Sequence, residues 1–409
     1  MARPVVNVEK PLEQGLRNLW YPIARSDQVG SAPLGVKALG EELVLWRDAT
    51  GQVRAMIDRC PHRDTKLSLG EVVDGVLACA YHGFRFDATG QCVAVPSEGG
   101  DCPLARRLRV RSYPTQERVG LVFAYIGEVD LFPPPPLEIA AELEDPAWTG
   151  FICQATWQAN WLRIFDNLAD PMHGPFLHGR SYTLSRGKRA DRLRLSELPD
   201  GGFTVEREGQ RGVNFDWVEF HRTGSLWCRL DIPYPWSAGP GDPLRIVGWV
   251  TPLDANSATV YFLRYRKVSG WRRVLWRSLY KLYLERNHWA VLEQDRVAME
   301  AQRGIESRVN EHLAPTDLGT IRLRRLFQQE LARQRDVYAR AGRVPGAAPA
   351  AEPSAPAADA APSSPSRQVD RARAQPTPSP PGRGAGGEAS YSLSPWERAG
   401  VRATSCLTH

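Results

Sequence analysis

Residues 60–92 read CPHRDTKLSLGEVVDGVLACAYHGFRFDATGQC and carry two short ligand pairs. Cys60-Pro61-His62 and Cys79-Ala80-Tyr81-His82 are separated by sixteen residues. Two cysteines and two histidines suit either a tetrahedral zinc site or a two-iron, two-sulfur cluster in which two thiolates hold one iron and two imidazoles the other. Two loops that each supply one Cys and one His are what the cluster needs. The glycines at 70, 75, 83 and 90 allow such loops to turn tightly.

Short β-like segments surround these loops, from about Trp20 to Gly127. Turn signals such as DATGQ separate them, and the segments are ELVLWR (42–47), VRAMID (53–58), GVLACA (75–80), CVAVP (92–96) and LVFAYIG (121–127). The pattern predicts a small antiparallel β domain over residues 1–130. The four prolines at 133–136 break any regular element, so we place a domain boundary there.

Residues 131–345 predict a second domain with helices on either side of an antiparallel sheet. A helical pattern over roughly 157–180 is interrupted at Pro171 and Gly174. Alternating strands then follow over 203–266, and helical patterns return at about 271–309 and 321–340. The whole chain is therefore expected to belong to the α+β class.

The composition of the 409 residues narrows the class of protein. An odd number of cysteines, seven, does not indicate a disulfide framework, and no apolar run reaches the length of a membrane span or a signal peptide. We therefore expect a cytoplasmic protein. The net charge of +6 is spread along the chain without a nucleic-acid-reading motif, so no nucleic-acid partner is expected. Residues 346–409 are rich in Ala, Pro, Ser and Gly and predict a disordered tail.

A second group of ligands stands in NWLRIFDNLADPMHGPFLH, residues 160–178. It contains Asn167, Asp170, His173 and His178 in the arrangement Asn-x2-Asp-x2-His-x4-His. Two histidines and one carboxylate on one face of an iron leave positions open for oxygen and substrate. An isolated His-x4-His pair is more often a pair of ordinary hydrogen-bonded histidines, but the ligands upstream favour a metal. Pro171 disfavours helical geometry at Asp170 and predicts a break there.

The carboxylate ligand must come from elsewhere, and HWAVLEQDRVAMEAQ, residues 288–302, offers Glu293, Asp295 and Glu300. Residues three and four apart share a helix face. Asp295 has only apolar neighbours at these spacings, namely Val291, Leu292, Ala298 and Met299. Both glutamates have arginine neighbours instead. A carboxylate in an apolar stripe is costly unless something pairs with it, so Asp295 is the predicted metal ligand. His288 is a possible supporting residue, although an ordinary exposed or core histidine is the simpler interpretation.

The stretch 60–92 resembles the Rieske domain of aromatic-ring-hydroxylating oxygenases. The resemblance implies that Cys60, His62, Cys79 and His82 hold a [2Fe-2S] Rieske cluster, with a zinc site as the alternative. Phe84 departs from the tryptophan that the family often has after His-Gly. The resemblance also implies an all-antiparallel-β Rieske domain, a helix-grip-like catalytic domain, and a mononuclear Fe(II) held by His173, His178 and Asp295.

In this family the cluster of one subunit faces the mononuclear iron of its neighbour in a homotrimer. The resemblance therefore implies that Asp170 bridges His82 of a neighbouring subunit and His173 of its own, with Asn167 in a supporting or purely structural role. It also implies a terminal oxygenase that uses O2 to hydroxylate, or O- or N-demethylate, an aromatic or related cyclic compound. Cis-dihydroxylation is the second reaction, and a Rieske electron carrier without oxygenase activity is a further alternative.

No flavin or nicotinamide motif is visible in the chain. Electrons are therefore expected from a separate NAD(P)H-dependent reductase, with or without a ferredoxin. The basic residues beside the cluster ligands, Arg59, Arg63, Lys66 and Arg85, suit docking of an acidic donor. The basic, aromatic stretch 271–289 is interpreted as a helix that covers the active site, with a membrane-surface helix as the alternative. Strand residues between 203 and 266 are expected to line the substrate pocket.

Overall fold

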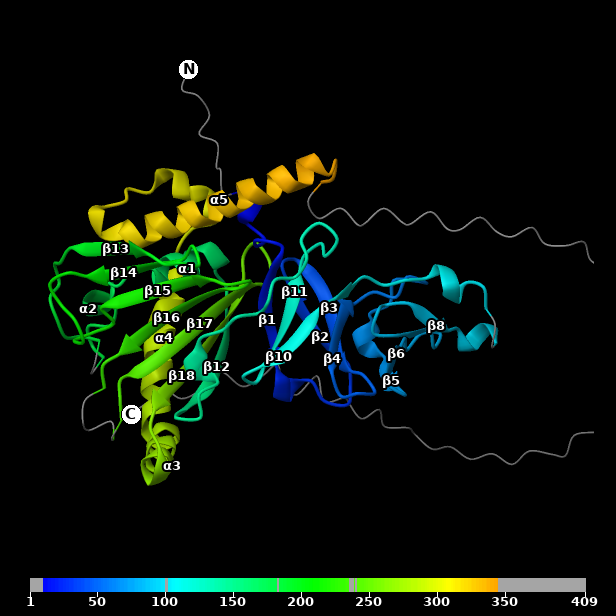
Figure 1. The fold of residues 1–409 in the computed structure, drawn as a ribbon, viewed down its shortest axis with the longest axis horizontal. Coiled ribbons are helices and arrows are strands. Elements are labelled where there is room, and N and C mark those ends of the chain that lie inside the picture. The colour runs from blue at the N-terminus through cyan, green and yellow to red at the C-terminus, as the bar shows by residue number, and fades with distance from the viewer. Residues whose placement is uncertain (1–9, 100–101, 182–183, 235–238, 240, 345–409) are drawn as a thin grey trace, which may run out of the picture. The chain divides into compact units, whose positions relative to one another are not determined.

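The computed structural model describes residues 10–99, 102–181, 184–234, 239 and 241–344, and these lie in one compact unit. The described residues form four antiparallel sheets (Figure 1). Three small sheets lie in the N-terminal part and one seven-stranded sheet lies in the C-terminal part. The predicted tail, 346–409, lies outside the described residues. The expected boundary near residue 130 falls between β11 and β12, and the domain boundaries stay predictions.

The N-terminal part consists of strands and short turns. One sheet has the order β1-β11-β10, a second β2-β3-β4-β9 and a third β5-β6-β7-β8. Their bounds are β1 Leu19–Arg25, β2 Leu34–Ala38, β3 Glu41–Arg47, β4 Val53–Ile57, β5 Glu71–Val73, β6 Val76–Ala78, β7 Arg85–Phe86, β8 Cys92–Ala94, β9 Ser112–Tyr113, β10 Thr115–Arg118 and β11 Leu121–Ile126. Each of the predicted segments between residues 42 and 127 coincides with or overlaps one of these strands.

The C-terminal part is built on the sheet β12-β18-β17-β16-β15-β14-β13. Its strands are β12 Trp148–Trp157, β13 Leu193–Glu197, β14 Phe203–Arg207, β15 Trp217–Arg222, β16 Leu226–Ile232, β17 Leu244–Pro252 and β18 Ala258–Lys267. Its helices are α1 Trp161–Leu168, α2 Gly174–Leu177, α3 Gly270–Leu279, α4 Glu285–Glu300 and α5 Leu318–Arg340, with a π-helical turn, Tyr280–Leu284, between α3 and α4. The α+β expectation is confirmed.

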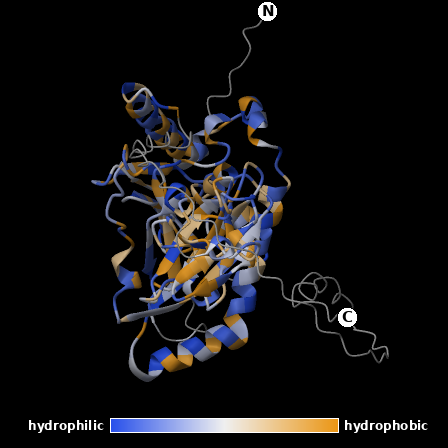
Figure 2. Cartoon of the chain, turned by 90° about the vertical axis from the view of Figure 1, so that its right-hand side faces the viewer, coloured by the Kyte–Doolittle hydropathy of each residue, from blue (hydrophilic) through white to orange (hydrophobic). Residues whose placement is uncertain are grey.

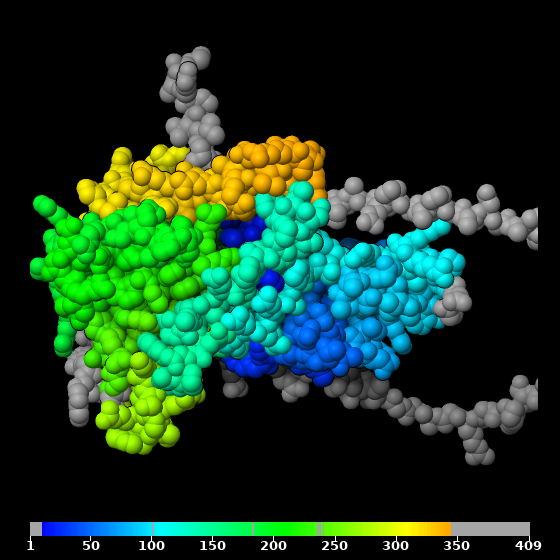
Figure 3. Space-filling view, viewed as in Figure 1, coloured from blue at the N-terminus to red at the C-terminus, as the bar shows by residue number. Residues whose placement is uncertain are grey.

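The central strand β18 is buried on both faces because its alternate side chains enter two different cores. Val260 and Phe262 pack in the core that also contains residues of α1, α4 and α5. Tyr261 and Leu263 point the other way and pack with Trp20 of β1 and with residues of β11. Hydrophobic residues accordingly gather in the interior, whereas the outer helices carry both hydrophilic and hydrophobic residues (Figure 2). Helix α5 lies along the β13–β14 side of the sheet (Figure 3).

Three sequence-based expectations about this part are wrong in detail. The helix expected from residue 157 begins at Trp161, because residues 148–157 form β12 instead. The edge strand β13 was not expected. The helical pattern expected to continue to 309 ends at Glu300, and a short 3-10 segment, Ile305–Asn310, follows it. The expected break at Pro171 is confirmed, since α1 ends at Leu168 and α2 starts at Gly174.

Candidate metal centres

The two Cys-His pairs lie on neighbouring loops of the N-terminal part. Cys60 follows β4 and Cys79 follows β6, and both side chains are buried in one hydrophobic core. Burial, together with the nearby Cys79 thiol, raises the pKa of Cys60 to about 11. A thiol in this setting stays protonated near neutral pH unless a cation stabilises its thiolate. The two thiols are therefore placed to share one metal.

The histidines of these pairs lie at the surface instead of in the core. His62 is exposed and His82 is partly exposed, and their ring centroids are 4.7 Å apart. The two cysteines on the buried side and the two histidines on the outer side match the donor set of a Rieske cluster. The structure therefore brings the two predicted cysteine ligands close to each other and, likewise, the two predicted histidine ligands.

Backbone hydrogen bonds close each loop on its own cysteine. The Asp64 amide donates to the Cys60 carbonyl at 2.9 Å, and the Gly83 amide donates to the Cys79 carbonyl at 3.0 Å. Gly83 has a φ of 72°, a left-handed conformation that glycine adopts without strain. At Gly70 the backbone is extended, but a Cβ there would lie 1.9 Å from the Ala78 carbonyl oxygen. Both glycines are therefore needed for the shape of the loops.

Phe84 packs against the two loops that carry the Cys-His pairs. Its buried ring stacks on His62, with centroids 4.5 Å apart and planes 15° apart. Phe84 also closes the second loop, because its carbonyl accepts a hydrogen bond from the Cys79 amide at 2.8 Å. The residue that departs from the family pattern is thus part of the packing that holds one of the histidines.

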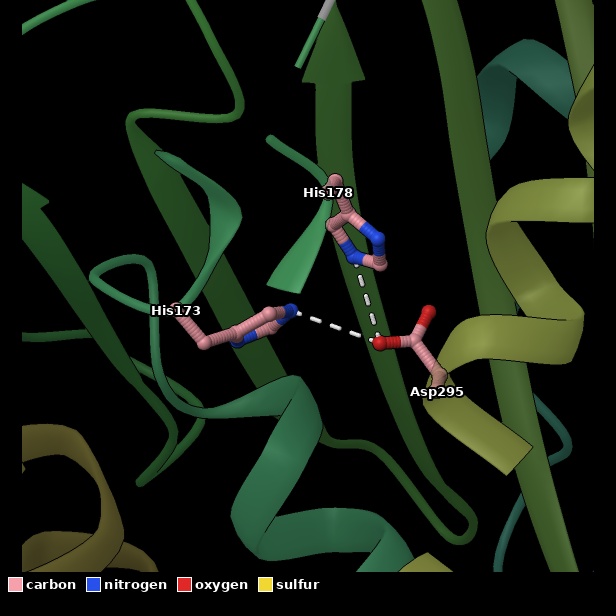
Figure 4. A group of neighbouring side chains, drawn as sticks. All are labelled: His173, His178 and Asp295. Atoms are coloured by element: carbon pink, nitrogen blue, oxygen red, sulfur yellow. Dashed lines mark ion pairs between the residues drawn. The ribbon is translucent and has the colours of Figure 1, made fainter. Parts of the chain in front are cut away.

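The second group of ligands lies in the C-terminal part. His173 precedes α2, His178 follows it, and Asp295 lies on α4 (Figure 4). The Asp295 Oδ1 atom is 3.5 Å from His173 Nε2 and 3.2 Å from His178 Nε2, and one donor atom from each residue lies within 4.8 Å of the others. Two imidazoles and one carboxylate at this separation fit a divalent iron with positions left open.

The charges in this group are strongly coupled. Burial disfavours the imidazolium of His173, but the nearby carboxylates of Asp170 and Asp295 outweigh this effect and raise the pKa of His173 to about 9. Burial likewise opposes ionisation of Asp295, yet the two histidines lower the pKa of its carboxyl to about 2. Without a metal, a proton on His173 balances the buried carboxylate. A divalent cation would serve the same purpose for all three groups.

Two neighbours orient the ligand side chains. Gln294 Oε1 lies 2.9 Å from His178 Nδ1 and accepts a hydrogen bond from the Nδ1–H group. The Nε2 atom of His178 therefore keeps a free lone pair for a metal. Asn167 donates from Nδ2 to Asp295 Oδ1 at 3.3 Å, a contact that suits the supporting role predicted for it. Gln294 was not predicted, because its only signal in the sequence is its position next to Asp295.

Asp170 lies beside His173 and is not a fourth member of the ligand group. Its Oδ2 atom is 3.7 Å from His173 Nδ1, longer than a hydrogen bond, and its Oδ1 accepts from the Met172 amide at 2.7 Å. The two glutamates that were weighed against Asp295 lie elsewhere. Glu293 and Glu300 both pair with Arg296 on the outer side of α4.

A cavity of about 100 Å³ adjoins the His173, His178 and Asp295 side chains. Most of its walls come from apolar residues of the sheet and of α4, including Leu230, Leu244, Ile246, Phe262 and Leu292. The strand residues agree with the expected region, 203–266. His288 also lines it, and its Nε2 lies 2.7 Å from the Tyr234 hydroxyl. The cavity can therefore hold a small, largely apolar compound beside the three ligands.

Comparison with known proteins finds a family match in each of the two parts of the chain. The family model of the Rieske [2Fe-2S] domain matches residues 19–114, and that of the vanillate O-demethylase oxygenase C-terminal domain matches residues 157–333. The fold and its two ligand groups thus define a two-centre oxygenase class. The chain belongs to the Rieske non-haem iron oxygenases, which are oxidoreductases that carry a [2Fe-2S] cluster and a mononuclear iron.

Individual relatives span most of the chain. The phenoxybenzoate dioxygenase subunit alpha of Ectopseudomonas oleovorans is 29% identical over 350 residues, which cover 79% of this chain and 82% of that protein. The 5,5'-dehydrodivanillate O-demethylase oxygenase subunit of a Sphingobium species is 29% identical over 350 residues, covering 78% and 77%. The crystal structure of dicamba monooxygenase has a TM-score of 0.62 at 23% identity, covers 78% of this chain and 98% of its own, and shows the shared fold.

Both of these sequence relatives are described as subunits, and the O-demethylase relative as the oxygenase subunit. Among the described residues, no helix is long and apolar enough to cross a membrane.

Proposed function

We propose that this chain is a terminal oxygenase that monooxygenates a small aromatic or related cyclic compound by hydroxylation or by O- or N-demethylation. The observation that carries the proposal is the convergence of His173, His178 and Asp295 on one side of a mostly apolar cavity. Cis-dihydroxylation is the second candidate, because relatives of similar coverage include both a dioxygenase subunit and an O-demethylase subunit.

In this proposal the [2Fe-2S] cluster is held by Cys60, His62, Cys79 and His82. The mononuclear iron is held by His173, His178 and Asp295. When bound, the two centres supply single electrons and a site for oxygen activation. Gln294 keeps His178 in the tautomer that offers Nε2, and Asn167 limits rotation of the Asp295 carboxylate. The apolar walls position the substrate and exclude bulk water.

Asp170 is proposed to connect the two centres in a homotrimer. Its side chain is 27% exposed and lies 3.7 Å from His173, so its carboxylate can face both the ligand and the protein surface. His82 is partly exposed on the other part of the chain, next to Tyr81, which is 52% exposed. A neighbouring subunit that covers this surface would bring His82 to Asp170. One hydrogen-bonded carboxylate between two ligand imidazoles gives a short route for an electron.

The electron donor is proposed to be an NAD(P)H-dependent reductase, with or without a ferredoxin. Of the basic residues beside the cluster, Arg59 and Lys66 both bind Glu42, at 2.5 and 2.7 Å. Arg63 instead lies over the exposed Tyr81 ring, 5.3 Å from its centroid. Arg63 is thus the better placed cation for an acidic donor. The expected cytoplasmic location is part of this proposal.

Metal and sulfide analysis of the purified chain tests the proposed function. The oxygenase requires about three irons per chain, acid-labile sulfide and Rieske absorbance. About two irons would indicate an electron carrier, and zinc would indicate a structural module. Turnover of methoxylated and hydroxylated aromatics with a surrogate reductase then separates demethylation from dihydroxylation, because only demethylation releases formaldehyde.

A further inference from the structure

Arg264 places a positive charge in the wall of the candidate active-site cavity. It lies on β18 and points to the same side of the sheet as Val260 and Phe262. The residue is only 3% exposed. The cavity that it lines is the one that His173, His178 and Asp295 adjoin. A permanently charged side chain therefore shares an otherwise largely apolar space with the proposed iron ligands.

The contacts of the Arg264 guanidinium leave its charge without a counter-ion. Nη1 donates to the Tyr280 hydroxyl at 3.0 Å and Nη2 donates to the His288 carbonyl at 3.4 Å. The Trp289 ring lies 5.3 Å from the guanidinium carbon. Across the described residues, no carboxylate forms an ion pair with Arg264. Two other arginines of the same sheet differ in this respect, since Arg229 binds Glu142 and Glu219 and Arg245 binds Glu142 and Asp231.

An unpaired buried charge is costly, and arginine cannot avoid the cost by losing its proton. The remaining guanidinium N–H groups form a planar fork that matches a carboxylate. The other titratable group in the wall, apart from the proposed ligands, is His288, and burial lowers its pKa to about 3. His288 is neutral near pH 7, so Arg264 supplies a single positive charge.

We infer that Arg264 determines substrate specificity by binding the carboxylate of an aromatic monocarboxylate. One cation neutralises one negative charge, which favours a carboxylate over a doubly charged phosphate. The apolar residues Leu230, Ile246 and Phe262 provide the surface for the ring. A ring anchored at Arg264 then occupies the cavity that the three ligands adjoin. The inference rests on the proposed function, because it takes this cavity as the substrate site.

Isothermal titration calorimetry with matched probes tests the inference on the holoprotein. The probes are benzoate, 3-methoxybenzoate, 4-methoxybenzoate and 3-phenoxybenzoate, each compared with its neutral amide. We expect the best-bound acid to bind roughly 10- to 100-fold more tightly than its amide, as a charge-assisted pair implies. Arg264→Met should remove this preference, because it lowers the affinity for the acid and changes the affinity for the amide by no more than about twofold. Arg264→Lys keeps the charge but not the fork and should lie between the two.

Arg194→Met serves as the matched control, because Arg194 is an exposed arginine of the same sheet and binds Glu206 outside the cavity. It should leave the acid-to-amide ratio unchanged. Circular dichroism and the melting temperature show whether each variant folds. The acid-to-amide affinity ratio of the wild-type protein tests the inference even if a variant fails to fold. Equal binding of acid and amide, a preference that survives in a folded Arg264→Met protein, or no binding of any acid would overturn the inference.

Iron and sulfide contents of the same preparations separate the two proposals. A protein with about three irons but no preference for acids contradicts only the role of Arg264. A protein without iron that still prefers acids through Arg264 contradicts only the oxygenase proposal.

Discussion

The His178 imidazole donates its Nδ1 proton to Gln294 Oε1 over 2.9 Å, and Gln294 directly precedes Asp295 on α4. One turn of one helix therefore supplies both a proposed iron ligand and the group that orients another ligand. Metal-binding histidines commonly rely on such a partner to hold the ring and its tautomer.

Replacing Gln294 by alanine is expected to weaken iron binding at the mononuclear site about 10- to 100-fold, because His178 loses the acceptor that orients it. Titration with a competing iron chelator measures the affinity. Gln294→Glu keeps an acceptor oxygen and should retain most of the affinity. Gln302→Ala, in an exposed glutamine beyond the helix, is the control. Equal iron affinity in Gln294→Ala and wild type would exclude the orienting role.

Asp295→Ala is expected to remove the mononuclear iron and leave the cluster, because the two ligand groups lie in different parts of the fold. Iron content should fall from about three to about two per chain, with unchanged Rieske absorbance. Glu293→Ala is the control, because Glu293 lies on the same helix but its carboxylate pairs with Arg296. This variant should keep the full iron content. Loss of iron in both variants would contradict the assignment of Asp295.

Asp170→Asn is expected to retain both metals while turnover falls about 100-fold, since the amide is a poorer bridge between two imidazoles. Single-turnover kinetics should show a cluster that the reductase still reduces but that reoxidises slowly. Asp200→Asn is the matched control. The Asp200 carboxylate also contacts a histidine, with its Oδ2 atom 2.9 Å from His221 Nδ1, but neither residue lines the cavity. Unchanged turnover of Asp170→Asn would rule out the bridging role.

Phe84→Ala is expected to lower the free energy of unfolding by about 3 kcal/mol or more, because it empties a buried ring-sized space beneath His62. Urea denaturation followed by circular dichroism, with bleaching of the cluster as a second signal, measures the change. Leu69→Ala, at a side chain that is 67% exposed, should change stability by less than about 0.5 kcal/mol. A similar effect of the two substitutions would contradict the packing role of Phe84.

Reversing the charges of Arg63 and Arg85 is expected to slow reduction of the cluster by an acidic donor about tenfold at low ionic strength, with a smaller effect at high salt. Stopped-flow absorbance of the cluster gives the rate. Arg194→Glu changes the charge of the other part of the chain and should have little effect. Equal reduction rates in the double variant and wild type would remove these arginines from the docking surface.

The sequence alone predicts most of the proposed ligands, because the residues of each Cys-His pair and of the His173–His178 pair lie close together in the chain. Cys60 with His62, and Cys79 with His82, lie within single loops, so their spacing carries most of the geometry. Asp295 was also predicted without the fold, since helix periodicity showed a carboxylate among apolar neighbours. The same reasoning placed the helix break at Pro171, because proline restricts the residue before it.

Other features depend on pairing between distant residues. Strand β12 was missed because its pairing with β18 joins residues about a hundred positions apart, and β13 because it is an edge strand with exposed residues. The roles of Gln294 and Arg264 are invisible in the chain for the same reason. A glutamine beside a charged residue and an arginine in a strand are ordinary sequence features. Folding alone puts Gln294 against His178 and places Arg264 in a buried cavity where none of the described residues supplies it with a carboxylate. Burial is what makes such an uncompensated charge select its partner.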